Sequence, residues 1–251
     1  MKLKIPKKDL IKIEERNEAP FFVSKYRLGN NSQKDSIATA LEKDSPTFNT
    51  AKELNGHPYI ENINWEQAMK LALLFGLPPT LKDHQLYREI LDQGRKEERG
   101  VYDGGGNIVN SKECKQLYDE LMGQRDPWRG EYLDAYFESG EDEVFYLLSD
   151  HRLQEGILLP QRREKLNPST YRKDGFVDIP SFTKQGLPTK LENGKQRNLY
   201  YFHPQDRSVA RLRANSGMVY LDCYCDPQNS DSGLGVRAKI LIEEQSHFKK
   251  D

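Results

Sequence analysis

The sequence predicts a single α+β domain in which helices pack on antiparallel sheet and long loops occupy the C-terminal part. Helix-capping patterns followed by apolar residues at helical spacing occur in the first half of the chain. From about residue 140 onward, short apolar runs are broken by Pro, Gly, Asn and Asp, which is typical of strands and loops. The 251 residues contain no internal repeat and no low-complexity linker. We therefore expect a solvated lead-in over residues 1–19 and one domain over residues 20–245.

Two consecutive helices are the best-marked elements. Asn64 can cap the first helix, Gln67 can complete a capping box, and Gly76 ends the helix. Thr80 and Asp83 repeat the capping pattern at the start of the second helix. The apolar residues that follow each cap lie at helical spacing, which predicts one buried face for each helix.

Shorter elements are expected on both sides of these helices. Residues 21–26 are a strand candidate, and residues 101–109 predict two short strands around a glycine turn. Ser111 is expected to cap a helix that runs to about Met122.

The segment after residue 125 predicts one more helix. Asp126 and Pro127 suit the N-cap and the first helical position. Trp128, Tyr132 and Tyr136 follow at a spacing of four, which places them on one face of a helix.

Charged residues are abundant but balanced, with 38 Lys and Arg against 39 Asp and Glu. Such a balance gives no whole-protein attraction to nucleic acid or anionic lipid, so we expect neither as a partner. No apolar run approaches the roughly eighteen residues of a membrane span, and the N-terminal segment lacks the apolar core of a secretory signal. We expect neither membrane insertion nor a signal peptide.

Cys223 and Cys225 raise the question of a metal or redox site. A structural zinc site needs four ligands, usually in closely spaced pairs, and only Cys114 remains as a third thiol. Because side chains at i and i+2 of a strand share a face, both thiols are expected to project to the same side, where a disulfide between them would be strained. Zinc and redox chemistry are therefore disfavoured. We expect no cofactor, while a bound calcium or other ion stays open.

The region around these cysteines has an unusual composition. The chain contains 22 Lys and 21 Glu, and an even distribution would place about seven of them between Arg197 and Ala238, where there is none. Asn, Ser, Asp, Tyr, Gly, Cys and Arg take their place. These residues are typical of binding loops, because Tyr gives stiff contact area while Ser, Gly and Asn give adaptable hydrogen bonds. The alternative is a loop-rich end that simply disfavours Lys and Glu.

Three segments carry patterns that are found together in one known family. Residues 22–30 (FVSKYRLGN), residues 63–80 with Trp65 (INWEQA followed by FGLPPT), and residues 234–237 (LGVR) resemble motifs of formylglycine-generating-enzyme-type domains. That family is a branch of the C-type lectin fold, and the resemblance implies this fold. The chain departs from the family at Pro78, where the family has Leu, and at residues 85–87, where it has an acidic-aromatic pair.

The last part of the chain carries a second resemblance. Residues 224–237 (YCDPQNSDSGLGVR) are similar to the variable region of diversity-generating-retroelement proteins, most of all to those of archaea and their viruses. In that family a mutagenic reverse transcriptase randomises adenine-rich codons, and mutated Asn-type codons never yield Lys, Glu, Gln, Met or Trp. The resemblance implies that residues 200–237 form a variable ligand-binding region, and it accounts for the missing Lys and Glu. Gln205, Met218 and Gln228 are then expected at fixed positions.

Strand alternation predicts which side chains of this region face a ligand. We expect Tyr220, Asp222 and Tyr224 on one strand face, opposite Leu221 and Cys223. The residues expected to point outward are Asn215, Gly217, Tyr220, Asp222, Tyr224, Asn229 and Asp231, with Cys225 and Gly233 as weaker candidates.

The same region also contains the expected scaffold. The residues expected to point inward are Val209, Ala210, Leu221, Leu234 and Val236, and Trp65 and Gly235 belong to the same scaffold. Arg237 is expected to tie loops together through bonds to a carboxylate or to backbone carbonyls.

These expectations lead to a function. The chain is predicted to be a non-catalytic protein that binds an unknown protein or glycan ligand on a cell surface, and that is itself displayed on a virion or cell surface. Two alternatives stay open. One is an oxidase of the formylglycine-generating type with Cys223 or Cys225 as a metal-binding thiolate, although that family's catalytic cysteines are spaced more widely. The other is a plain structural virion protein.

Overall fold

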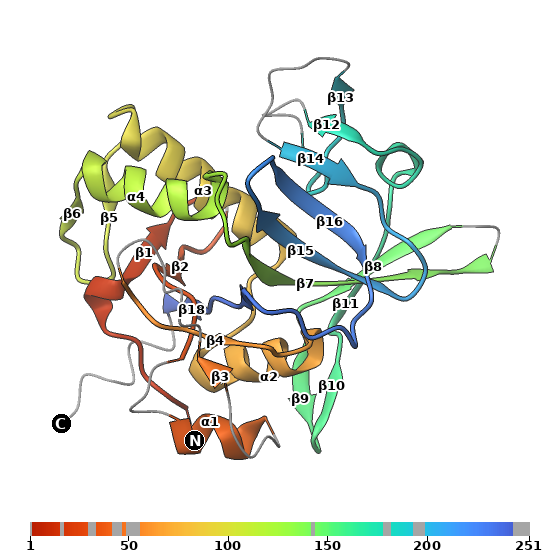
Figure 1. Ribbon diagram of the computed structural model, residues 1–251, viewed down its shortest axis with the longest axis horizontal. Helices are drawn as coiled ribbons and strands as arrows, with labels where there is room; N and C mark the ends of the chain where they lie inside the picture. The colour runs from red at the N-terminus through yellow and green to blue at the C-terminus, as the bar shows by residue number, and fades with distance from the viewer. Residues whose placement is uncertain are drawn as a thin grey trace.

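A mixed sheet of nine strands organises the computed structural model (Figure 1). The structure describes residues 2–15, 18–29, 34–41, 47–48, 56–141, 144–177, 182–192 and 199–242. Along the sheet the strand order is β11-β8-β7-β15-β16-β14-β12-β13, and β17 pairs with β7. The pairs β14–β16 and β17–β7 are parallel, and the other pairs are antiparallel. The strands are β7 (Arg129–Ser139), β8 (Phe145–Ser149), β11 (Arg162–Lys165), β12 (Gly175–Val177), β13 (Leu191–Glu192), β14 (Leu199–Phe202), β15 (Ser208–Ala214), β16 (Val219–Cys225) and β17 (Leu234–Gly235).

A three-stranded sheet joins the two ends of the described chain. Its order is β1-β2-β18, and β2 pairs antiparallel with both neighbours. Its strands are β1 (Leu10–Ile13), β2 (Phe21–Ser24) and β18 (Lys239–Leu241). Three two-stranded pairs complete the β structure: β3 (Thr47–Phe48) with β4 (Ile60–Glu61), β5 (Val101–Tyr102) with β6 (Ile108–Val109), and β9 (Arg152–Gln154) with β10 (Ile157–Leu159).

Two of the helices, α2 and α3, begin directly after the caps that the sequence predicts. The α-helices are α1 (Lys34–Ala40), α2 (Trp65–Phe75), α3 (Leu81–Arg95) and α4 (Ser111–Met122), with 3₁₀ turns at Lys7–Asp9 and Pro168–Thr170. Both predicted capping boxes are confirmed, because the Gln67 amide donates to Asn64 Oδ1 at 2.9 Å and the Asp83 amide donates to Thr80 Oγ1 at 3.2 Å. The fourth helix is confirmed, but Asn110 rather than Ser111 is its N-cap.

Two apolar clusters lie on opposite sides of the large sheet. In the first, α3 and α4, which pack side by side (Figure 1), cover strand residues such as Leu133, Leu212 and Leu221. In the second, α2 packs with strand residues such as Tyr132 and Val209. β7 contributes to both clusters, and β15 and β16 reach the second cluster only through Val209 and Cys225, so the sheet is buried on both faces around β7 and at this end of β15 and β16.

The predicted helix after Asp126 is wrong, because the chain there forms the long strand β7. A spacing of four residues is a multiple of two as well as about one helical turn, so it fits one face of a strand equally well. Trp128, Tyr132 and Tyr136 do share a side, since all three belong to or pack against the second cluster.

The expectation of a solvated lead-in is also wrong where it covers β1. Leu10, Ile11 and Ile13 are almost completely buried, and β1 pairs with β2. The strand has only four residues and follows a lysine-rich stretch, so its apolar pattern is short and easily missed. The structure is a mixed α+β fold with a large mixed sheet and few helices, which confirms the predicted α+β class. The expected antiparallel sheet is corrected, because the pairs β14–β16 and β17–β7 are parallel.

Candidate ligand-binding surface

The predicted variable region forms β14, β15 and β16 and the loops that follow them. Leu199, Tyr201, Leu221 and Cys223 pack in the first apolar cluster from one side of these strands. The opposite side carries the alternating residues of the same strands. Tyr220, Asp222 and Tyr224 lie on this side, so the predicted alternation along β16 is confirmed.

Five aromatic side chains gather on this outer side, and we call them the aromatic face: Phe176, Tyr200, Phe202, Tyr220 and Tyr224. The strand register places Phe176 beside Tyr200 and Tyr200 beside Tyr220. Ring centroids are 5.1 Å apart for Phe176 and Tyr200, 5.9 Å for Phe202 and Tyr220, and 5.0 Å for Phe202 and Tyr224. Tyr224 is 37% exposed and the other four residues are half-buried, so each member of the row keeps part of its surface in contact with solvent.

Two arginines border the aromatic face on β15. Arg213 lies opposite Tyr220 in the register, and its guanidinium carbon is 4.3 Å from the centre of the Tyr220 ring. Its Nε donates to Asp222 Oδ2 at 2.5 Å, and Arg211 Nε contacts the same oxygen at 3.3 Å. Arg211 also pairs with Asp231. The arginines therefore place positive charge beside the rings.

Asp222 is a correction to the predicted ligand surface. It lies on the outer side as predicted, but its side chain is fully buried beneath Arg211 and Arg213. A buried carboxylate with two guanidinium partners holds the arginines in place, and it is not available to a ligand.

The turn between β15 and β16 contains two further predicted residues. Asn215 Oδ1 accepts hydrogen bonds from the backbone amides of Gly217 and Met218, both at 2.9 Å. Gly217 is exposed and Asn215 is half-buried. Both residues therefore lie at the surface, although the Asn215 side chain also supports the turn.

The loop from β16 to β17 places Asn229 and Asp231 outward, as predicted. Asn229 is exposed, and its carbonyl accepts a hydrogen bond from the Tyr132 hydroxyl at 2.7 Å. The Asp231 side chain is 40% exposed and pairs with Arg211. The hydrogen bond to the loop backbone thus helps to fix the path of the loop, and the Asn229 side chain takes no part in that bond.

Gly233 is a second correction, because it is buried and has φ +83°. Its amide donates to Glu61 Oε2 at 2.9 Å, and its carbonyl accepts from the Tyr59 hydroxyl at 3.1 Å. A Cβ at this position would lie 2.7 Å from the Trp128 carbonyl oxygen. The backbone conformation and the lack of space both require glycine here.

The cysteines are a third correction. Cys225 is buried rather than outward, and the two thiols do not share a face, because Cys223 packs in the first cluster and Cys225 in the second. A β-bulge causes this, since Val209 pairs with Cys225 but Arg211 pairs with Asp222. Burial raises the pKa of Cys225 to about 12 and that of Cys223 well above its usual range. Both are therefore protonated thiols at neutral pH.

The predicted scaffold residues are confirmed as buried: Val209, Ala210, Leu221, Leu234, Gly235, Val236 and Trp65. Trp65 Nε1 donates to the Leu133 carbonyl at 2.9 Å and so joins α2 to β7. Arg237 ties segments together as predicted, because its Nε lies 2.9 Å from Glu131 Oε2 and its Nη1 donates to the carbonyls of Ser24 and Lys25.

Several members of this surface were not predicted from the sequence. The alternation of Arg211 and Arg213 with apolar neighbours was a usable signal for their outward direction. Phe176, Tyr200 and Phe202 were missed because they reach the surface only through the pairing of β14 with β12 and β16. No local pattern specifies that pairing.

Comparison of the chain with models of known protein families, with curated proteins and with solved structures found no match. Among the described residues, no group of three or more His, Cys, Asp or Glu side chains is arranged to hold a metal ion. In the same part of the chain, no helix is both long and apolar enough to cross a membrane.

Proposed function

We propose that this chain is a non-catalytic recognition protein that binds a protein or glycan ligand on a cell surface through the aromatic face and the adjoining loops. The observation that carries this proposal is the row of five partly exposed rings. These rings lie on strands whose opposite side packs into the first apolar cluster. Tyr and Phe provide large, stiff contact area at low entropic cost, and the neighbouring arginines add charge for orientation.

The arrangement of β16 supports variation of this surface by a retroelement. Leu221 and Cys223 fill the core, while Tyr220 and Tyr224 contact mainly other rings of the face. A change at Tyr220 or Tyr224 therefore leaves the core packing intact. Exchange of exposed side chains on a rigid support is what a diversified binding protein requires.

We also propose that the fold is of the C-type lectin type with the formylglycine-generating-enzyme pattern. The segments that resemble the first and last strand motifs of that family lie side by side, because the Leu28 amide donates to the Val236 carbonyl at 2.8 Å and Arg237 reaches Ser24. Asn30, which ends the first motif, is outside the described residues. Trp65 of the middle motif packs in the core between α2 and β7.

The two alternative functions have less support. An oxidase would use Cys223 or Cys225 as a thiolate, but both thiols are buried on opposite sides of the sheet and have raised pKa values. A plain structural virion protein has no need of a solvent-open aromatic row beside arginines. The proposal places the protein on a virion or cell surface.

A binding comparison tests the proposal. The double substitution Y220A/Y224A is compared with Y102A, which removes another exposed tyrosine at β5 outside the aromatic face. The full chain, fluorescently labelled, is applied to a glycan array and to a panel of intact archaeal and bacterial cells. We expect the wild type and Y102A to bind the same target, and Y220A/Y224A to bind it at least tenfold more weakly. Equal binding by all three proteins would refute the role of the aromatic face.

A genomic observation tests the diversification separately. We expect a near-copy of the coding segment for residues 200–238 beside a reverse-transcriptase gene. If no such copy exists in the genome that encodes this chain, the retroelement part of the proposal fails, and the binding part still stands or falls on the tyrosine substitutions.

A further inference from the structure

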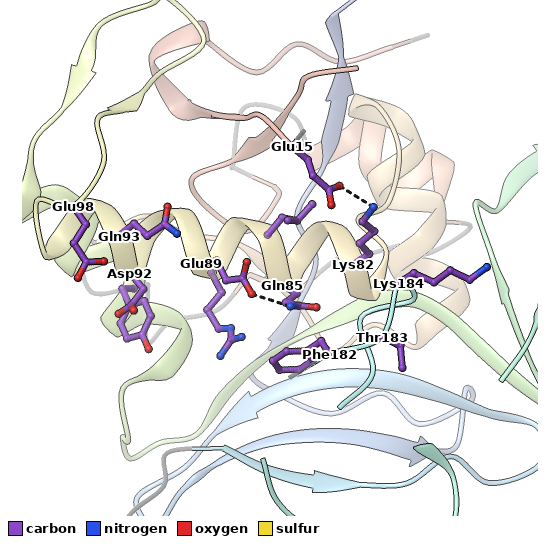
Figure 2. Close-up of a pocket in the computed structure, with 13 residues that line it drawn as sticks. Glu15, Lys82, Gln85, Glu89, Asp92, Gln93, Glu98, Phe182, Thr183 and Lys184 are labelled. Carbon is purple, nitrogen blue, oxygen red and sulfur yellow. Dashed lines mark hydrogen bonds and ion pairs between the residues drawn. The ribbon is translucent and has the colours of Figure 1, made fainter. Parts of the chain in front are cut away.

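A cavity of about 600 Å³ lies along α3. Figure 2 shows it between the exposed side of α3 and the segment that carries Phe182, Thr183 and Lys184. Leu86 and Phe182 give it apolar walls, and Arg88, Glu89 and Asp92 bring charge to it. Its size suits a small organic molecule.

Arg88 is the unusual residue of this cavity. It is only 5% exposed, and it makes no hydrogen bond or ion pair with any residue that the structure describes. Its Nη2 is completely buried without a partner, and its guanidinium carbon lies 5.2 Å from the centre of the Phe182 ring. Burial lowers the pKa of Arg88. A buried guanidinium without an acceptor is costly, so such a group needs an explanation.

The surroundings leave one direction from which a ligand can approach Arg88. On its inner side Arg88 borders a void of only about 20 Å³, which is too small for an organic ligand and is lined by His84 and Gln85 together with leucines. On its other side lies the large cavity. A ligand in that cavity can therefore provide an acceptor that the described residues do not supply.

The other cations of the cavity, Lys82 and Lys184, already have carboxylate partners. Lys82 pairs with Glu15 at 2.8 Å, and Glu89 accepts a hydrogen bond from Gln85 at 2.8 Å, as the dashed lines in Figure 2 mark. Asp92 pairs with Arg95 and with Lys96. Arg88 is thus the cation of this cavity whose charge stays uncompensated among the described residues.

We propose that the cavity is a binding site for a small monocarboxylate with an apolar body. The carboxylate accepts hydrogen bonds from Arg88, because the planar guanidinium matches the two oxygens of a carboxylate. The apolar body packs against Phe182 and Leu86. Glu89 and Asp92 repel a second negative charge, so dicarboxylates and phosphate esters fit poorly. This site does not depend on the proposed function of the aromatic face.

Thermal unfolding of the full chain with three related probes tests the charge requirement. Phenylacetate carries the single carboxylate, phenylacetamide is its neutral analogue, and phenyl phosphate carries more negative charge. At ten times its dissociation constant, phenylacetate is expected to raise Tm by about 3–5 °C at constant ionic strength. We expect no shift with the other two. Equal shifts with phenylacetate and phenylacetamide, or no shift with phenylacetate, would overturn the proposal.

Substitution of Arg88 tests the residue itself. R88M removes an unpaired buried charge and keeps a long apolar stem, so the protein is expected to fold and to lose at least tenfold in phenylacetate affinity by isothermal titration calorimetry. K96M removes one positive charge just beyond the C-terminal end of α3, outside the cavity lining, and is expected to bind like the wild type. R88K keeps the charge but loses the planar pair of donors, and we expect an intermediate affinity. Undiminished phenylacetate binding by R88M or R88K would show that Arg88 does not hold the ligand.

Discussion

Replacement of Asp222 by asparagine tests whether this residue anchors the surface or belongs to its variable part. In the structure the Asp222 carboxylate is fully buried, with Arg213 Nε at 2.5 Å and Arg211 Nε at 3.3 Å from the same oxygen. Asn has the same shape but no charge. The substitution D222N therefore leaves Arg213 without its carboxylate partner and leaves Arg211 with Asp231 alone.

The expected loss of unfolding free energy follows from the burial of the Asp222 side chain and of its two arginine partners. Removal of one member of a buried ion pair costs about 3–5 kcal/mol, because the remaining charge is uncompensated. Here the side chains of Arg211 and Arg213 keep 15% and 21% exposure, and Arg211 keeps a second carboxylate. Water and Asp231 offset part of the loss, so we expect D222N to lower the free energy of unfolding by about 2–3 kcal/mol.

Urea denaturation followed by far-ultraviolet circular dichroism measures this loss. A lower midpoint at unchanged slope would report lost stability without a change in the surface exposed on unfolding. D231N is the matched control, since Asp231 is 40% exposed and pairs with Arg211 alone. It is expected to cost about 0–1 kcal/mol. If D222N costs no more than D231N, Asp222 is not an anchor and the reasoning from burial is wrong.

Three further outcomes are expected. G233S should lose about 2–3 kcal/mol of unfolding free energy, because φ is +83° and a Cβ would lie 2.7 Å from the Trp128 carbonyl oxygen. G217S, at an exposed turn, should lose less than about 0.5 kcal/mol. Equal losses of the two variants in chemical denaturation would contradict this expectation. Burial alone would raise the pKa of Glu131, but Arg237 and His84 outweigh it and hold that pKa well below its usual range, so the stability that Glu131 contributes is present above about pH 4.3 and falls below it. Between about pH 4 and 3 the wild type should lose about 1.2 kcal/mol more than E131Q, and parallel stability curves would refute the assignment. At pH 8, iodoacetamide should alkylate Cys225 at least about a thousandfold more slowly in the folded than in the urea-unfolded chain, because burial raises the pKa of this thiol to about 12. The two alkylation rates are measured by mass spectrometry, and comparable rates would exclude a buried thiol.

Local patterns were sufficient for part of the fold. The start of α2 depends on Asn64 and Gln67, which lie within one helical turn, so the sequence contains all that the capping box requires. The strand β7 was wrongly predicted as a helix because the contacts that decide its structure are not local. Tyr132 and Tyr136 fit a helix face and a strand face equally, and only pairing with β8 and β15 decides between them. Of these partners, β15 lies far along the chain, where no local pattern identifies it.

In the candidate surface, too, some features could be predicted from local sequence and others could not. The sides of Tyr220, Leu221 and Tyr224 could be predicted, because they depend on the alternation of one strand. The burial of Asp222 could not, since it depends on two arginines of β15 that lie above its carboxylate. The separation of Cys223 from Cys225 depends on a bulge, which the sequence of β16 does not mark.

The corrections also change which positions a retroelement could vary without loss of the fold. Asp222, Cys225 and Gly233 are each held by burial, so freedom at these positions would conflict with stability. Tyr220, Tyr224 and the exposed residues of the two loops carry no such constraint. Phe176 belongs to the same aromatic face but precedes the proposed variable region. Under the proposed function, a ligand that spans the face would contact a constant part from β12 and a variable part from β16, so that the constant part would provide general affinity and the variable part would set specificity.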